Sequence, residues 1–172
     1  KLINNQDLKI EDISVPSLPT NHSLVQIDFV GLCSSDIART YNNGAYNYPL
    51  VIGHEAMGTI VESSSPELSK GDKVVIFPLK PCFECENCIS EQYQRCSSYS
   101  YYGSREDGAM QEMLNVQNWN LIKLDSQINP RDAALTEPTA VMVHVKNLLN
   151  ESLEKGISDE SGAIIGGGFL SL

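Results

Sequence analysis

Hydrophobic residues along the first two-thirds of the chain fall in short runs between polar segments. The clearest runs span residues 24–30, 58–61 and 73–77, and each contains valine and isoleucine. Glycine, proline, asparagine and serine separate them, as at 42–44, 63–66 and 70–72. Many short strands joined by polar turns predict a mainly β fold, either a barrel or a sandwich. Residues 34–41 predict a short helix after the first of these runs.

The pattern changes near Asn129 and Pro130. Alanine, leucine and valine dominate residues 131–149, and their spacing predicts one or two helices. A polar stretch at 150–161 then leads to an apolar segment at 162–165 and to three consecutive glycines at 166–168. This last segment predicts a short strand that runs into a glycine-rich turn.

Length and charge narrow the range of partners. The chain has 172 residues, enough for one domain and part of a second. Its net charge is −10, so a nucleic acid or an anionic membrane would be repelled, and we expect neither as a partner. No apolar run approaches the length of a membrane span, and no charged-then-apolar leader opens the chain. Together with the cysteine pattern, this predicts a cytoplasmic protein.

Four of the five cysteines lie close together, in the order Cys82-x2-Cys85-x2-Cys88-x7-Cys96. The two-residue gaps let one loop direct several sulfurs at a single point, as a tetrahedral Zn²⁺ with thiolate ligands requires. Disulfide pairs are an alternative, but nothing else suggests a secreted protein. An iron–sulfur cluster is another, but bacterial ferredoxins use Cys-x2-Cys-x2-Cys-x3-Cys-Pro, whereas Ser97 follows the last cysteine here. A third is a redox-sensing thiol module that releases zinc on oxidation. The spacing favours structural zinc.

A second metal site is conceivable from residues that are scattered along the chain. Cys33, His54 and Glu137 would supply one thiolate, one imidazole and one carboxylate. Such a set would leave a fourth, open position on Zn²⁺, which distinguishes catalytic from structural zinc. Taken one at a time, each residue has a simpler explanation, as a small core residue, a turn histidine or a surface charge.

Several motifs occur in one order along the chain. They are Gly31-Leu32-Cys33-x2-Asp36, Gly53-His54-Glu55-x2-Gly58, Lys70-Gly71-Asp72-Lys73-Val74, the four-cysteine lobe and Glu137-Pro138. This order resembles the zinc-dependent medium-chain alcohol dehydrogenase family. The match runs from about residue 24 to the last residue. The segments at 48–55, 81–85 and 102–108 are similar to the polyol branch, which includes galactitol-1-phosphate and sorbitol dehydrogenases.

The resemblance implies a GroES-like β-barrel catalytic domain with a zinc lobe over residues 1–145. Residues 146–172 would then begin an NAD-binding Rossmann domain. The family uses two zinc ions, one structural and one catalytic, and NAD as cofactor, with NADP not excluded. Members are commonly dimers or tetramers, so a homodimer or homotetramer is expected of the full-length protein.

The resemblance also implies roles for single residues. Cys33 and His54 would hold the catalytic zinc, and Glu55 would lie beside or on the metal. Glu137 would take the third protein position, as in many polyol dehydrogenases. Ser35 would hydrogen-bond the substrate hydroxyl and pass its proton outward. Ala38 stands where many alcohol dehydrogenases carry a relay histidine, so a proton path through that position is absent.

The last residues resemble part of a dinucleotide-binding turn. Gly166-x-Gly168-x-x-Ser171 matches Gly-x-Gly-x-x-Gly except at its third glycine. Such a turn needs a following helix and an acidic residue further on to bind a dinucleotide. We therefore expect a fragment or a truncated member. If these residues are the whole molecule, we predict no NAD-linked turnover.

The sequence leaves two hypotheses about function. The first is a zinc-dependent oxidoreductase that transfers hydride between NAD(P) and a polyol or sugar alcohol, either neutral or phosphorylated. The alternative is a catalytically inactive zinc-binding β-domain with a structural role. Recognition of a phosphate would need basic residues at the cleft, for which Arg39 and Arg105 are candidates.

Overall fold

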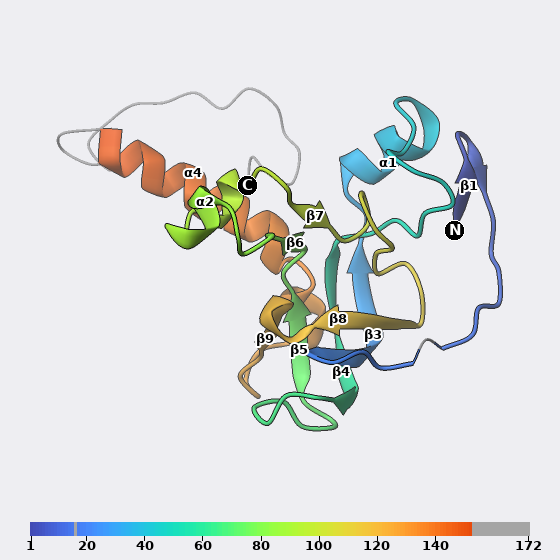
Figure 1. The fold of residues 1–172 in the computed structure, drawn as a ribbon, viewed down its shortest axis with the longest axis horizontal. Coiled ribbons are helices and arrows are strands. Elements are labelled where there is room, and N and C mark those ends of the chain that lie inside the picture. Colours follow the sequence, from blue (N-terminus) through green and yellow to red (C-terminus); the bar gives the residue numbers. More distant parts are fainter. Residues whose placement is uncertain (16, 153–172) are drawn as a thin grey trace.

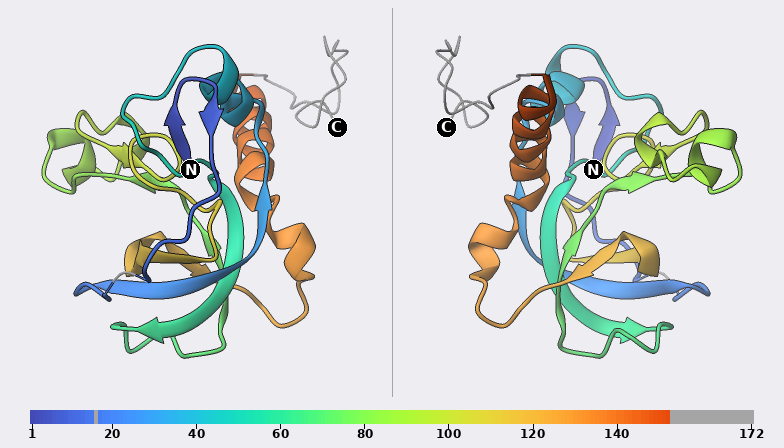
Figure 2. Two further views of the ribbon diagram at one scale, coloured as in Figure 1. Left: turned by 90° about the vertical axis from the view of Figure 1, so that its right-hand side faces the viewer. Right: turned by 90° about the vertical axis from the view of Figure 1, so that its left-hand side faces the viewer.

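The computed structural model describes residues 1–15 and 17–152, and its centre is a five-stranded antiparallel sheet (Figure 1). The strand order is β8-β3-β4-β5-β9. The bounds of these strands are Met113–Gln117 for β8, His22–Gly31 for β3, Glu55–Ser63 for β4, Lys73–Ile76 for β5 and Leu121–Lys123 for β9. Figure 2 shows that β3 and β4 bend strongly, so the sheet curves round its own inner face.

Smaller elements surround this sheet. Two short antiparallel pairs are β1 (Leu2–Asn4) with β2 (Asp7–Leu8), and β6 (Leu79–Lys80) with β7 (Ser100–Tyr101). The helices are α1 (Ser34–Tyr41), α2 (Glu86–Ile89), α3 (Pro130–Ala133) and α4 (Thr136–Ser152). Two 3-10 turns, η1 (Tyr93–Arg95) and η2 (Asn118–Asn120), complete the described elements. No helix among the described residues has the length and apolar character needed to cross a membrane.

Alternation along the strands decides which side chains form the core. On β5, Val74 and Ile76 are buried in the main cluster, together with Val25 of β3 and Ile60 of β4. Val75, between the first two, faces the other side of the sheet and packs in a second cluster with residues of α3. This period of two is typical of a sheet that is covered on both faces, and it gives the domain its main core on the concave side.

The predicted elements can be compared directly with the described ones. The predicted mainly β fold is confirmed. The runs at 24–30 and 58–61 lie within β3 and β4, and the run at 73–77 corresponds to β5, which ends one residue earlier. The predicted helix at 34–41 coincides with α1, and residues 131–149 form most of α3 and α4. The predicted strand and glycine-rich turn at 162–172 lie outside the described residues. The domain boundary at 145 stays a prediction, and α4 runs across it.

Tyr102 connects the core to a pH dependence that can be measured. Its side chain is buried in the main cluster, and its hydroxyl accepts a hydrogen bond of 3.1 Å from the backbone N–H of Gln117. Burial raises the pKa of Tyr102 well above its ordinary value of 10, and the charge of Glu106 adds to the effect. The folded state therefore disfavours the tyrosinate, whereas the unfolded chain can ionise freely above pH 10.

Raising the pH above 10 is expected to destabilise the protein through Tyr102. The stabilising contribution of its raised pKa is complete below the unfolded value and is lost as the pH rises, by up to about 1.4 kcal/mol per pH unit. Replacing Tyr102 by phenylalanine should flatten this slope, at a cost of about 1 kcal/mol for the lost hydrogen bond. Urea unfolding of both proteins at several pH values above 9 measures the difference. Parallel pH profiles would contradict the assignment.

Candidate metal centres

The four-cysteine lobe brings its sulfurs to one point. Cys85 immediately precedes α2, Cys88 lies within that helix, and Cys96 directly follows η1. The four Sγ atoms all lie within 4.8 Å of one another. The Sγ atoms of Cys82 and Cys88 are 3.9 Å apart, and those of Cys85 and Cys96 are 4.0 Å apart. Four sulfurs bound tetrahedrally to zinc would be about 3.8 Å apart, so the donor set fits this ion.

Backbone N–H groups inside the lobe favour thiolates. The N–H of Cys82 donates to Cys96 Sγ at 3.2 Å, and the N–H of Cys85 donates to Cys82 Sγ at 3.4 Å. Backbone donation from Ser97 and Cys88 lowers the pKa of the Cys85 thiol to about 6. Burial acts in the opposite direction and raises the pKa of Cys88 to about 12. Because metal binding requires thiolates, a bound cation would stabilise the form that burial disfavours at Cys88.

An aromatic cluster attaches this lobe to the barrel. Phe83 lies between two of the cysteines in a left-handed conformation, with φ of 61°. Its ring contacts that of Trp119 edge to face, with centroids 5.0 Å apart. Tyr93 of η1 and Phe77 also contact Trp119, at 5.2 and 5.6 Å. Trp119 belongs to η2 beside the main sheet, so the metal-binding loop packs on the barrel through these rings.

A second donor group forms where β3 and β4 meet. Gly31, the last residue of β3, pairs with Glu55, the first residue of β4. Cys33 follows β3 by two residues, and His54 precedes β4 directly. One donor atom from each of Cys33, His54 and Glu55 lies within 4.8 Å of the others. The antiparallel register therefore brings together residues that are 21 positions apart in the sequence.

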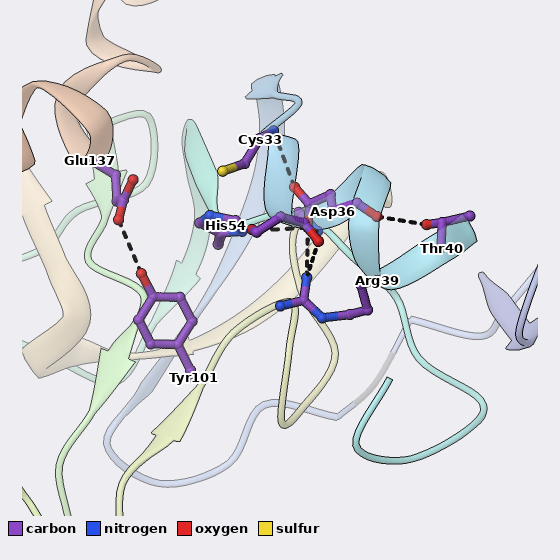
Figure 3. A network of polar contacts seen from close by, with 9 residues as sticks. Cys33, Asp36, Arg39, Thr40, His54, Tyr101 and Glu137 are labelled. Atoms are coloured by element: carbon purple, nitrogen blue, oxygen red, sulfur yellow. Dashed lines mark hydrogen bonds and ion pairs between the residues drawn. The ribbon is translucent and has the colours of Figure 1, made fainter. Parts of the chain in front are cut away.

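The carboxylate of Asp36 of α1 faces the imidazole of His54 (Figure 3). Its Oδ1 lies 3.5 Å from His54 Nδ1 and 3.1 Å from Arg39 Nη1. The Asp36 side chain is fully buried, and its Oδ2 accepts a hydrogen bond of 3.3 Å from the N–H of Cys33. With Nδ1 facing this carboxylate, Nε2 is the nitrogen available to a metal. A carboxylate behind a metal-binding histidine fixes the tautomer and the direction of the ring.

The charges around His54 favour a cation. Burial lowers the pKa of His54, but the contact with Asp36 and the charge of Cys33 outweigh it and raise this pKa to about 9. Burial raises the pKa of Glu55, and His54 opposes this effect. The imidazole of His54 is thus surrounded inside the protein by Asp36, Cys33 and Glu55, which carry negative charge when they are ionised. Because buried charges need compensation, the donor set fits a divalent metal ion.

Hydrogen bonds from residues 107–109 hold the segment before His54 in place. The N–H of Val51 donates to Asp107 Oδ1 at 2.8 Å, and the N–H of Gly108 donates to the carbonyl of Val51 at 2.7 Å. The N–H of Ala109 reaches the carbonyl of Gly53 at 2.8 Å. A Cβ atom on Gly108 would collide with the carbonyl oxygen of Gly53, so only glycine allows this close approach.

Glu137 lies outside the group of three donor atoms. It is in the first turn of α4, and its Oε1 accepts a hydrogen bond of 3.1 Å from the Tyr101 hydroxyl. The Tyr101 ring is edge-on to His54, with centroids 5.7 Å apart, so both side chains face the region of the metal site (Figure 3). Burial and the charge of Glu137 raise the pKa of Tyr101 further above its ordinary value. A direct bond from Glu137 to zinc therefore stays a prediction.

The other expected site residues are placed as follows. Ser35 lies in the first turn of α1 and lines a hollow together with Arg39 and Tyr46. Gly166, Gly168 and Ser171 lie outside the described residues. Sequence reasoning assigned no role to Asp36 or Tyr101. Asp36 could have been found, since it stands three residues after Cys33 in the quoted motif, but nothing local in the sequence marks Tyr101.

Comparison with known proteins agrees with this geometry. The model of the alcohol dehydrogenase GroES-like domain matches residues 19–126, well over half of the chain. The chain belongs to the zinc-type medium-chain alcohol dehydrogenase family. It is 34% identical to galactitol 1-phosphate 5-dehydrogenase of Escherichia coli (strain K12), over 99% of the chain and 49% of that protein. It is 32% identical to sorbitol dehydrogenase of Bombyx mori, over 82% of the chain and 42% of that protein. These similarities confirm the polyol branch.

A solved structure shows the same fold. The crystal structure of galactitol-1-phosphate dehydrogenase from Escherichia coli superimposes with a TM-score of 0.80 at 34% identity, and covers 84% of this chain and 42% of that one. The expected GroES-like domain is thus confirmed. The chain spans about half the length of the curated relatives that it matches.

Proposed function

We propose that this chain is the catalytic domain of a zinc-dependent dehydrogenase that oxidises a secondary hydroxyl of a polyol or sugar alcohol with NAD(P). The observation that carries the proposal is the convergence of Cys33, His54 and Glu55, whose histidine ring contacts Tyr101 at the edge of a cleft. The cleft has a volume of about 850 Å³, and Tyr101, Glu137 and Arg39 are among its lining residues. Similarity to galactitol 1-phosphate and sorbitol dehydrogenases supports a polyol as the substrate class.

The residues near the metal site would have separate roles as ligands and as positioning groups. Cys33 and His54 would hold the zinc, with Asp36 facing the ring of His54, and Glu55 would lie beside the metal. Zinc bound there would supply Lewis acidity that lowers the pKa of a substrate hydroxyl. Glu137 is the third protein ligand in this proposal, and Tyr101 holds its carboxylate near the imidazole. NAD(P) would accept the hydride.

Ser35 would carry the proton away from the substrate. A serine hydroxyl can accept a proton on one side and donate its own on the other, so it suits a relay next to the metal. Ser35 lies two residues beyond Cys33, on the helix whose first turn also contains Asp36. Since Ala38 cannot relay a proton, the path from Ser35 leads to water or to hydroxyl groups of the cofactor.

The native full-length gene product, loaded with zinc, provides the test. With NAD⁺ and sorbitol we expect NADH formation, followed by its absorbance. Ser35→Ala should lower kcat/KM by about a hundredfold or more, which is the usual contribution of a positioned proton-transfer group. Ser34→Ala is the matched control, because Ser34 is exposed in the same turn, and it should retain activity. Retained zinc in the cysteine lobe with no turnover on any polyol would instead favour a structural zinc-binding domain.

A further inference from the structure

One arginine at the cleft is held by aromatic rings rather than by a carboxylate. The guanidinium carbon of Arg105 lies 4.5 Å from the ring centroid of Tyr46 and 4.5 Å from that of Tyr99. Its Nη2 also donates to the Tyr99 hydroxyl at 3.3 Å. All three residues line the cleft of about 850 Å³. Flanking rings restrict the side chain while they leave most of its N–H groups free to donate.

Arg105 also lacks an acidic partner. The sequence has 22 aspartates and glutamates against 12 lysines and arginines, so carboxylates outnumber basic side chains. Yet over residues 1–15 and 17–152 Arg105 takes part in no ion pair. Its guanidinium therefore has no carboxylate partner among these residues, and its side chain is exposed and lines the cleft.

Arg39, the other arginine that lines the cleft, differs in this respect. Its Nη1 lies 3.1 Å from Asp36 Oδ1, so its charge is already matched by a buried carboxylate. It serves the metal site by supporting Asp36. Of the two arginines considered from the sequence, Arg105 alone has its charge free.

The position of Arg105 relates it to the proposed proton relay. Tyr46 lines both the cleft and the smaller hollow that contains Ser35. The hollow and the cleft are therefore adjacent at Tyr46, and Ser35 lines the hollow while Arg105 lines the cleft. A substrate whose hydroxyl reached Ser35 could extend a distal group toward the guanidinium.

We propose that Arg105, positioned by Tyr46 and Tyr99, binds a terminal anionic group of the substrate and so selects phosphorylated over neutral polyols. This inference rests on the proposed polyol dehydrogenase function. A guanidinium donates two parallel hydrogen bonds to a phosphate or a carboxylate, which makes its recognition directional as well as electrostatic. A phosphomonoester and a sugar-acid carboxylate share this chemistry, and the experiment separates them.

Titration calorimetry on the zinc-loaded full-length protein tests the proposal with three probes, namely sorbitol, sorbitol 6-phosphate and gluconate. We expect sorbitol 6-phosphate to bind about 10- to 100-fold more tightly than sorbitol, as charge-assisted hydrogen bonds typically provide. Arg105→Ala should remove this preference, so that sorbitol 6-phosphate binds no more tightly than sorbitol. Arg105→Lys keeps the charge but loses the paired geometry, and should retain only part of the preference. Arg131→Ala, on an exposed position of α3, is the control and should retain all of it.

Each outcome is informative. Tighter binding of gluconate, again lost in Arg105→Ala, would support the anion site with a carboxylate as its ligand. Equal binding of all three probes, or a preference that survives Arg105→Ala, would overturn the role of Arg105 and leave the proposed function standing. Failure of all three to bind would count against both. Melting temperatures of the variants confirm that they are folded, and Arg105→Lys provides the test should Arg105→Ala be unstable.

Discussion

Replacing Cys88 by serine is expected to remove one zinc ion per chain and to unfold the lobe. The four sulfurs are close enough to share one ion, and Cys88 is buried among them, so no exposed residue could substitute for it. Structural zinc in small domains contributes about 10–16 kcal/mol of binding free energy that is also folding free energy. Metal analysis of the purified protein would give the stoichiometry directly. Fluorescence of Trp119 would report the lobe, since its indole packs against Phe83.

Cys33→Ser is the matched control for this experiment. It removes a thiolate from the other donor group and should leave zinc in the four-cysteine lobe and the Trp119 emission unchanged. An unaltered zinc content in Cys88→Ser, or zinc-free wild-type protein prepared under reducing conditions without chelator, would show that the lobe is not a zinc site.

Replacing Asp36 by alanine is expected to lower the free energy of unfolding by about 3–5 kcal/mol, because it leaves a buried partner without its counter-charge. Arg39 would lose its ion pair, and the N–H of Cys33 would lose its acceptor. His54 would also lose the carboxylate that faces its ring. The affinity of Cys33, His54 and Glu55 for a metal ion should therefore fall by about 10- to 100-fold. Urea unfolding and zinc titration measure the two effects.

The control for Asp36 is another aspartate in the first turn of a helix. Asp132 lies in α3 and is exposed, so Asp132→Ala should change the free energy of unfolding by under about 1 kcal/mol. Asp36→Asn keeps the shape without the charge and should fall between the two. If Asp36→Ala were as stable as Asp132→Ala, the buried carboxylate would not organise this site.

The parts of the fold that could be predicted depend on local patterns. A few neighbouring residues are enough to predict the strands, the polar turns, the start of α1 and the cysteine lobe. The pairing of Gly31 with Glu55 is different, since it depends on the register of two strands separated by a helix and a loop. Nothing in the sequence near His54 specifies that register. Cys33 and His54 could therefore be considered as ligands from residue type alone, and Glu55 could be added only through the family resemblance.

Glu137 shows where sequence reasoning reaches its limit. The motif Glu137-Pro138 identified an acidic residue for the metal, and the fold does place it at the right cleft. Its carboxylate, however, accepts a hydrogen bond from Tyr101, a partner 36 positions away. Tyr101 carries no local signal of such a role, because its importance comes from its contacts with Glu137 and with the imidazole of His54. Competition between partners for one carboxylate is visible only in three dimensions.

Residues 107–109, which bind the segment before His54, follow the cysteine lobe closely in the sequence. From Cys96 the chain passes Tyr99, Tyr101 and Arg105 before it reaches Asp107, whose carboxylate accepts the N–H of Val51. One stretch of 12 residues therefore begins at a cysteine of the candidate zinc lobe and ends at a hydrogen bond to the segment before His54. We therefore expect insertions or deletions in this stretch to shift the two candidate metal centres relative to each other, whereas surface loops attached to neither centre would tolerate them.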